Sequence, residues 1–452
     1  MARTDAGRAP LPRARISGRQ SALKACRFLL CLSILAWPAQ AADFRLLVGH
    51  GGPVMDAQVA RDGTTALTAS FDNSVGLWSL ASEDVRWLEG HEAAVKSVVY
   101  LSEDAAASSG DDFDIILWDL NGAKLRARLE GHKGQVNALA VSPDGTFLAS
   151  ASWDGSVGLW DIAKAQNIHL MTGHESSVSD VGFSPDGKFV YSASADGTIR
   201  SWDIATGEET RLLVQHGFGV NTLLIGETWL AYGAVDGGTR ILSLDSDKEL
   251  ADLTLDRRPI LSMALSPKGD EIAVGDGQGF VMTVATDGWQ ITGDYQAAAN
   301  GPVWALSYTG DGGSLLAGGI DDAAYIWPAH NDLDAPIMAT TKRGFLKDPN
   351  AMSNGERQFR RKCSICHSLS DDGKRRAGPT LAGLFGRPAG SVEGYSYSQT
   401  VADLGIDWTE ETIDQLFDLG PDHYIPGSKM PMQRIVRPED RRDLIEYLRD
   451  NT

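Results

Sequence analysis

The sequence predicts a multidomain protein in which an all-β ring of seven repeated units precedes a small all-α domain. A repeated pattern returns every 40 to 45 residues between residues 43 and 329. Turn signals separate short apolar runs inside each repeat, as expected for four-stranded units. The repeat then stops, and helical patterning begins after residue 348. With 452 residues, the chain is long enough for both regions and their separate cores.

The first segment of the chain has the pattern of a secretory signal peptide. Residues 1–27 carry seven Lys and Arg, an apolar run follows from Phe28 to Trp37, and a small-residue site ends at Ala41. This apolar run is too short to span a bilayer as a helix. We therefore expect cleavage after Ala41 and export across the inner membrane to the periplasm. Retention of residues 1–41 as an uncleaved anchor is the alternative.

A Gly-His pair, an Asp and a Trp recur in the same order along the ring region. In the four clearest copies the Asp stands six residues before the Trp, and three degenerate copies keep the Asp. The Asp and final positions of the seven copies are Asp72 and Trp78, Asp112 and Trp118, Asp154 and Trp160, Asp196 and Trp202, Asp236 and Leu242, Asp276 and Met282, and Asp321 and Trp327. Four short strands cannot bury both faces alone, so neighbouring units must stack.

These repeats resemble the WD-repeat family, and the resemblance implies a seven-bladed β-propeller over residues 42–329. It also implies that the stretch from Phe44 to Val48 closes the ring by pairing with the last blade. His132, Asp154 and Trp160 would then form a buried hydrogen-bond network, which is favoured over a metal or catalytic role. Propellers of this family are mostly platforms that bind other proteins.

The charge of the chain is uneven and excludes some classes of partner. The formal net charge is -19, and residues 43–343 hold 19 Lys and Arg against 42 Asp and Glu. Such acidity argues against binding to nucleic acid or to an anionic membrane surface. It suits either a solvated, soluble surface or attraction of a basic protein partner.

Cys363-Ser364-Ile365-Cys366-His367 has the spacing of a covalent c-type haem site. Both thiols can form thioethers with one porphyrin, and the imidazole that follows can bind the iron as an axial ligand. A thioredoxin-like redox pair or half of a zinc site would need a βαβ pattern or a second Cys pair, and the sequence has neither. We therefore expect one covalently bound haem c.

A second axial ligand is expected in a distant loop, and the stretch from Tyr424 to Met432 supplies it. This turn-rich loop places Met430 63 residues after His367. A thioether opposite an imidazole favours ferrous iron and raises the reduction potential. Met430 is the predicted ligand, and Met432 remains the alternative because the loop offers both.

Residues 344–452 resemble the class I cytochrome c family of the mitochondrial and photosynthetic-bacterial kind. The stretches that carry the resemblance are 378–387, 394–398, 405–408 and the Met loop. It implies that the carbonyl of Pro379 accepts the Nδ1 proton of His367. It also implies that Arg387, Tyr397 and Trp408 hold the haem propionates. Lysines around the haem edge are fewer than in that family, and Phe417 lies where the family often has Tyr.

The domains predicted are a signal peptide (1–41), a WD-repeat propeller (42–329), a linker (330–347) and a cytochrome c domain (348–452). Together they favour a periplasmic carrier of single electrons over an enzyme, with a redox partner protein and a second protein docked on the propeller. No nucleic acid partner and no transmembrane span in the mature chain are expected. Two alternatives are a haem enzyme or gas sensor with a labile sixth ligand, and an assembly protein in which the haem senses redox state.

Overall fold

The computed structural model describes residues 45–254, 259–298, 301–329, 352–364, 366–373, 375–426, 428–430 and 433–452. Within these ranges the chain forms 28 strands and then five helices. The predicted signal peptide and linker, and Met432, lie outside the described residues.

Each of the first four blades is an antiparallel sheet of four consecutive strands. Blade 1 comprises β2 (Val54–Val59), β3 (Thr65–Ser70), β4 (Ser74–Ser79) and β5 (Val85–Glu89). Blade 2 comprises β6 (Val95–Ser102), β7 (Ala105–Gly110), β8 (Ile115–Asp119) and β9 (Lys124–Leu129). Blade 3 comprises β10 (Val136–Val141), β11 (Phe147–Ser152), β12 (Ser156–Asp161) and β13 (Gln166–Thr172). Blade 4 comprises β14 (Val178–Phe183), β15 (Phe189–Ser194), β16 (Thr198–Asp203) and β17 (Glu209–Gln215).

The last three blades keep the four-stranded sheet, and the last of them takes a strand from the start of the chain. Blade 5 comprises β18 (Val220–Ile225), β19 (Trp229–Ala234), β20 (Thr239–Ser243) and β21 (Glu249–Asp252). Blade 6 comprises β22 (Ile260–Leu265), β23 (Glu271–Asp276), β24 (Phe280–Ala285) and β25 (Ile291–Gln296). Blade 7 comprises β26 (Val303–Tyr308), β27 (Ser314–Gly319), β28 (Ala323–Pro328) and β1 (Arg45–Val48).

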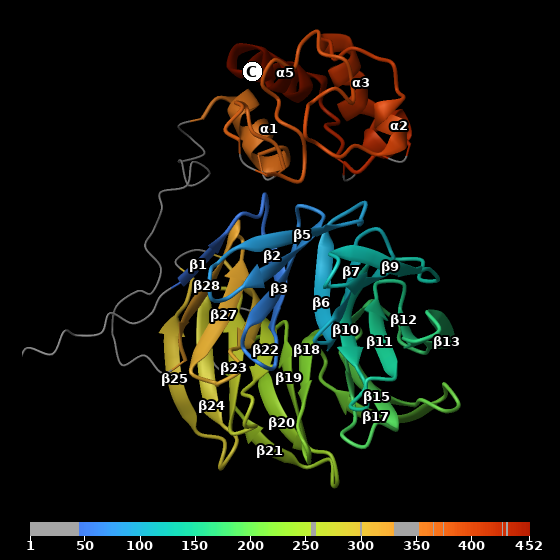
Figure 1. The fold of residues 1–452 in the computed structure, drawn as a ribbon, viewed down its shortest axis with the longest axis vertical. Helices are drawn as coiled ribbons and strands as arrows, with labels where there is room; N and C mark the ends of the chain where they lie inside the picture. Colours follow the sequence, from blue (N-terminus) through green and yellow to red (C-terminus); the bar gives the residue numbers. More distant parts are fainter. Residues whose placement is uncertain are drawn as a thin grey trace, which may run out of the picture. The chain divides into compact units, whose positions relative to one another are not determined.

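The strand β1 closes the ring. It pairs antiparallel with β28, with Arg45 opposite Ile326 and Val48 opposite Ala323, and the two strands lie side by side in Figure 1. The first strands of successive blades contact one another around the whole ring, β2 against β6 on one side and against β26 on the other. The prediction of a seven-bladed propeller is therefore confirmed.

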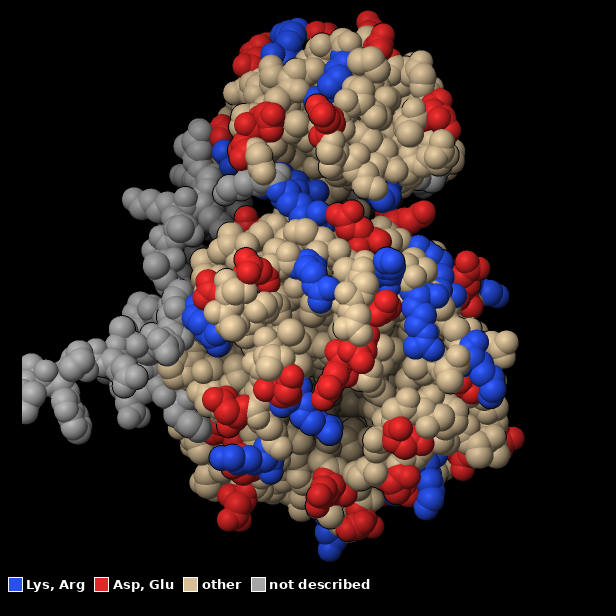
Figure 2. All heavy atoms as spheres, in the orientation of Figure 1, with Lys and Arg blue, Asp and Glu red and all other residues tan. Residues whose placement is uncertain are grey.

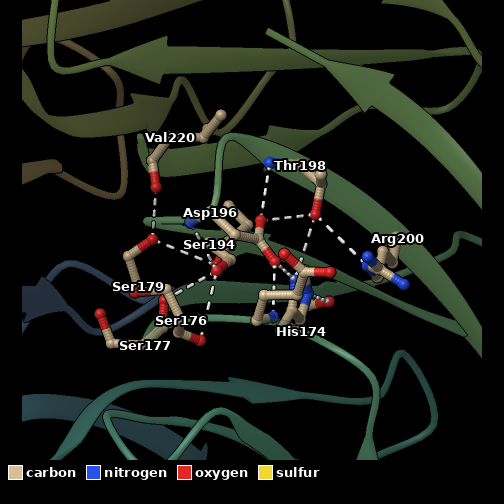
Figure 3. A network of polar contacts seen from close by, with 12 residues as sticks. His174, Ser176, Ser177, Ser179, Ser194, Asp196, Thr198, Arg200 and Val220 are labelled. Carbon is tan, nitrogen blue, oxygen red and sulfur yellow. Dashed lines mark hydrogen bonds and ion pairs between the residues drawn. The ribbon is translucent and has the colours of Figure 1, made fainter. Parts of the chain in front are cut away.

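A buried hydrogen-bond network holds each of the first four blades together. In blade 4, His174 Nδ1 lies 2.9 Å from Asp196 and its Nε2 lies 2.7 Å from Ser192 Oγ. The indole of Trp202 donates to the same Ser192 oxygen at 2.8 Å. Figure 3 shows how His174 and Asp196 meet, together with Thr198 from the start of β16. The network ties the segment before the blade to the turn between its second and third strands.

This Ser-His-Asp geometry resembles a hydrolytic triad, but its burial rules that role out. Ser192 is fully buried, and its oxygen already accepts the Trp202 indole, so no substrate carbonyl can reach it. The same arrangement recurs around His50, His91 and His132. The same arrangement of a His, an Asp and a hydroxyl side chain is present in all four of these blades, which indicates a structural role rather than a single catalytic site.

The degenerate blades keep a network but change its members. In blade 5, Leu242 stands at the Trp position, and the larger Tyr232 replaces the Ser and reaches His216 at 3.2 Å. In blade 7, Trp327 donates instead to Tyr295 of blade 6 at 3.0 Å. The repeat therefore tolerates loss of the Trp as long as the buried polar groups still find partners.

Two carboxylates join neighbouring blades at equivalent positions. Asp56 of β2 accepts hydrogen bonds from Ser97 Oγ and the Val98 amide of blade 2, both at 2.9 Å. Asp180 of β14 does the same with Thr222 and Leu223 of blade 5. Burial raises the pKa of each carboxyl to about 6, and it outweighs the hydrogen bonds, which favour the ionised form.

The all-α domain contains five helices. These are α1 (Asn354–Lys362), α2 (Gln399–Ala402), α3 (Glu410–Leu419), α4 (Pro421–Tyr424) and α5 (Pro438–Asn451). Helices α1 and α5 pack closely because Gly355 has no side chain: a Cβ there would lie 2.1 Å from the Asp443 carbonyl oxygen. The rings of Phe359 and Tyr447 meet beside it with centroids 5.8 Å apart.

The surface of the propeller is charged but mixed in sign. Figure 2 shows Asp and Glu side chains spread over its visible face, with Lys and Arg between them. Among the residues that the structure describes, no helix has the length and apolar character needed to cross a membrane.

We expect Trp160→Phe to destabilise the propeller by about 1–3 kcal/mol, because it removes the indole donor to Ser150 and leaves that hydroxyl less satisfied. Trp153→Phe in the same blade is the matched control: Trp153 is 60% exposed, so its loss should change stability by less than about 0.5 kcal/mol. Urea unfolding followed by circular dichroism measures both. Equal effects would contradict the structural role of the network.

We also expect the Asp56→Asn substitution to cost more stability at pH 4.5 than at pH 7.5. A folded-state pKa of about 6 exceeds the ordinary Asp value of 3.8, so this carboxyl stabilises the fold most when protonated. That contribution is lost as the pH rises through 6, and the loss between pH 4.5 and pH 7.5 amounts to roughly 2 kcal/mol. Asn cannot ionise and loses nothing over this range. Urea midpoints of both proteins at the two pH values test the sign, and a cost independent of pH would contradict it.

Candidate haem site

Helix α1 delivers the Cys-x-x-Cys-His motif to the interior of the domain. It begins at the N-cap Ser353, whose side chain accepts from the Glu356 amide, and it ends at Cys363. A tight turn follows, in which the His367 amide donates to the Cys363 carbonyl at 2.8 Å. Both sulfurs are buried, and both side chains line the same cavity as His367. The turn therefore gathers two thiols and one imidazole on one side of the chain.

The imidazole of His367 is oriented by the backbone. Its Nδ1 lies 2.7 Å from the Pro379 carbonyl oxygen, so Nδ1 donates and Nε2 carries the free lone pair. Burial lowers the pKa of His367, which keeps the ring neutral and able to bind a metal. Gly378 is required here because a Cβ at that position would lie 2.3 Å from the His367 ring.

Met430 lines the cavity together with His367. The loop that carries it is held by backbone hydrogen bonds on both sides: Ser428 donates to the Ile425 carbonyl, and Ile435 donates to Phe417. The Met430 amide also donates to Ser428 Oγ at 3.0 Å. These hydrogen bonds position the Met430 side chain although the residue lies in a loop and not in a helix. The choice between Met430 and Met432 stays a prediction, because Met432 is not among the described residues.

The three residues predicted to hold propionates all line the cavity. Arg387 donates to the carbonyl oxygens of Ala382 and Thr380 at 2.6 and 2.8 Å, so its guanidinium also braces the loop after His367. The Tyr397 hydroxyl accepts from the Val392 amide. The backbone of Trp408 pairs with Arg387 and Gly386. Propionate binding by Arg387, Tyr397 and Trp408 stays a prediction.

The sequence alone did not single out Tyr395 and Arg441. The Tyr395 hydroxyl donates to the Ala377 carbonyl, and its ring packs edge-on against Tyr397 with centroids 4.7 Å apart. Arg441 of α5 is buried and pairs with Asp414 and Asp418 of α3, and it also donates to the Ile435 carbonyl after the Met loop. Tyr395 lies in the stretch 394–398 that carries the family resemblance, but only Tyr397 of that stretch was assigned a role. Nothing in the sequence distinguished Arg441 from Arg442.

The residues present fit a covalent haem. The rest of the cavity wall is mostly apolar, with Leu384, Ile413, Phe417 and Leu448 among its side chains, and a mostly apolar wall suits a porphyrin face. Polar side chains such as Lys429 and Gln433 also line it. Burial raises the pKa of the Cys363 and Cys366 thiols to about 12, so both remain protonated before attachment. No group of three or more His, Cys, Asp or Glu side chains within the described residues could hold a bare metal ion. Thioether attachment through Cys363 and Cys366, with His367 and Met430 as axial ligands, is what the chemistry of these donors allows.

Comparison with known proteins gives two separate likenesses along the chain. A family model described as "Cytochrome c" matches residues 352–452, and one described as "WD domain, G-beta repeat" matches residues 43–79, 82–119, 123–161 and 165–203. Residues of the helical domain are 42% identical over 101 residues to the cytochrome c of Gibberella zeae, which covers 22% of this chain and 94% of that protein. The cytochrome c of Cannabis sativa is 38% identical over 104 residues, or 23% of this chain and 93% of that protein. That of Chlamydomonas reinhardtii is 39% identical over 101 residues, or 22% and 89%.

We expect Gly378→Ala to lower the haem content of the purified protein, because the new methyl group would collide with the His367 ring. Overpacking of this kind costs about 1–3 kcal/mol and would displace the imidazole. Gly373→Asn is the control, since that position has open space and a φ of 65° that Asn tolerates. The absorbance of haem relative to protein measures the effect. A full haem content in Gly378→Ala would contradict this role of Gly378.

Proposed function

Because the chain belongs to the cytochrome c family and carries a WD-repeat propeller ahead of that domain, we propose that it is a periplasmic carrier of single electrons that docks on its partners through the propeller. The observation that carries the proposal is the meeting of Cys363, Cys366, His367 and Met430 at one apolar cavity. When bound, haem c supplies an iron that cycles between the ferric and ferrous states.

The protein's part in this activity is to hold the surroundings fixed in both oxidation states. The Pro379 carbonyl keeps the His367 ring in one tautomer and orientation. The backbone bonds around Met430 hold its thioether at the cavity that His367 also lines. Apolar residues such as Phe417 exclude water from the cavity, and a dry cavity favours the less charged, reduced site. If His367 and Met430 both bound the iron, no position would be left for a substrate, which favours electron transfer over catalysis.

The propeller supplies the docking surface. WD-repeat propellers are mostly platforms that bind other proteins, and residues 43–79, 82–119, 123–161 and 165–203 match that repeat. A binding domain on the same chain as an electron carrier raises the effective concentration of that carrier near the bound partner. This gain in effective concentration requires no new contacts at the haem domain.

The first prediction of this function concerns carbon monoxide. We expect the reduced holoprotein to show an unchanged visible spectrum on addition of carbon monoxide, because Met430 occupies the sixth position. Met430→Ala should bind carbon monoxide promptly, which identifies the ligand that was removed. Prompt binding by the unaltered protein would instead mean a labile sixth ligand and would favour the enzyme or sensor alternative.

The second prediction concerns location. We expect the mature protein to begin at Ala42, because the site ending at Ala41 has the small residues that signal peptidases accept. Expression of the full chain with a c-type haem maturation system, followed by N-terminal sequencing of the protein in the periplasmic fraction, measures this. A protein that stays with the membrane and keeps residues 1–41 would support the anchor alternative.

A further inference from the structure

Three large apolar side chains are exposed in loops of blades 3 to 5. Trp153 is 60% exposed in the turn between β11 and β12, and Val235 is 45% exposed in the turn between β19 and β20. Phe218 is 59% exposed in the segment between β17 and β18. We call Trp153, Phe218 and Val235 the apolar patch. Three such side chains gathered on one part of a surface are more informative than single exposed leucines.

The loops that carry the apolar patch are joined to one another by backbone contacts. The turn before β16 meets the next segment where the His216 amide donates to the Gly197 carbonyl at 2.8 Å. That segment continues through Phe218, and the Gly219 carbonyl accepts from the Val235 amide at 2.9 Å. On the other side, Gly155, two residues after Trp153, lies close to Ser176: a Cβ on Gly155 would be 3.4 Å from the Ser176 carbonyl oxygen. The three side chains therefore lie on neighbouring loops, and hydrogen bonds join those that carry Phe218 and Val235.

The loops around the apolar patch are acidic. They comprise residues 131–135, 153–155, 173–177, 195–197, 215–219 and 235–238, which hold Asp154, Glu175, Asp196, Asp236 and one basic residue, Lys133. Hydrogen bonds lower the pKa of the three aspartates, so they are ionised at neutral pH. Glu175 is exposed between the Trp153 turn and the Phe218 segment.

Asp154 and Asp196 are turned inward onto His132 and His174, while Glu175 is exposed. An exposed indole among loops of net negative charge suits a cationic, partly apolar ligand. A Lys or Arg side chain can stack its charge on the Trp153 ring while its stem covers apolar surface. Trp is also the residue type most often found at the energetic centre of protein interfaces. Anionic ligands are disfavoured by four carboxylates against one ammonium.

We propose that the apolar patch binds a basic peptide segment of a partner protein, in which an aliphatic or aromatic side chain lies between Lys or Arg residues. This inference rests on the proposed docking role of the propeller and names the surface and the partner chemistry. The apolar side chain of the segment packs between Phe218 and Val235, and its cationic side chains lie over Trp153 and near Glu175.

The test uses the full-length holoprotein and two sets of labelled synthetic peptides. In the basic set, one Leu or Phe is flanked by Lys or Arg, and in the matched acidic set each cation is replaced by Glu. Fluorescence anisotropy at two salt concentrations measures binding. We expect the basic set to bind, and the double substitution Trp153→Ala with Phe218→Ala to weaken it at least about ten-fold. Glu175→Lys should weaken binding more at low salt than at high salt.

Leu212→Ala is the matched control. Leu212 is 46% exposed on the outer strand β17, away from these loops, so its loss should leave binding unchanged. If basic peptides bound the double variant as tightly as the unaltered protein, binding at the apolar patch would be contradicted. The proposed docking role of the propeller would still stand. A preference for the acidic set would also overturn the inference. Failure of both sets to bind the full chain would count against the inference and the docking role together.

Discussion

The hydrogen bond between a buried His and the Asp of the following turn is the constraint on which the first four blades depend. It links the segment that enters a blade to the turn between the second and third strands, and the Trp indole completes the network from below. The residue just before that Asp is exposed in blades 3 to 5, as Trp153, Ala195 and Val235. In these blades the turn that stabilises the core also carries a side chain that the propeller can offer to partners.

The hydrogen-bond partners of the buried histidines differ between the two regions, and this difference distinguishes a structural histidine from one that can bind a metal. In the propeller, His132 uses one ring nitrogen for Asp154 and the other for Ser150, so neither is left for a ligand. In the helical domain, His367 spends only Nδ1, on the Pro379 carbonyl. A carbonyl partner adds no negative charge, and the ring stays neutral with Nε2 free toward the cavity. One residue type is a structural cross-link in the first setting and the predicted metal ligand in the second.

The helical domain holds its ligands by fastening a loop to two helices. Arg441 of α5 reaches both Asp414 and Asp418 of α3 and the carbonyl of Ile435. A buried guanidinium with several acceptors is costly to disrupt, since removal of one partner leaves charge without compensation. The chain at Ile435, after the Met loop, is thus held to α3 and α5 through Arg441. Such fastening is what a ligand needs if it is to stay in place as the charge at the site changes.

The sequence alone predicted the repeated and local features of this protein. It did not predict contacts between residues that are far apart in the chain. The seven-bladed ring followed from an Asp that recurs six residues before each blade's final Trp or its substitute, because identical units must bury identical faces. The haem motif and the Met loop followed from local spacing, since five adjacent residues and one turn-rich loop carry the chemistry. The exchange of Tyr232 for Ser in blade 5, the bond from Trp327 to Tyr295 of another blade, and the reach of Arg441 were decided only by the tertiary structure. Each of these contacts joins residues that are brought together only by the packing of separate elements. The spacing of residues along the chain does not show which of them will meet.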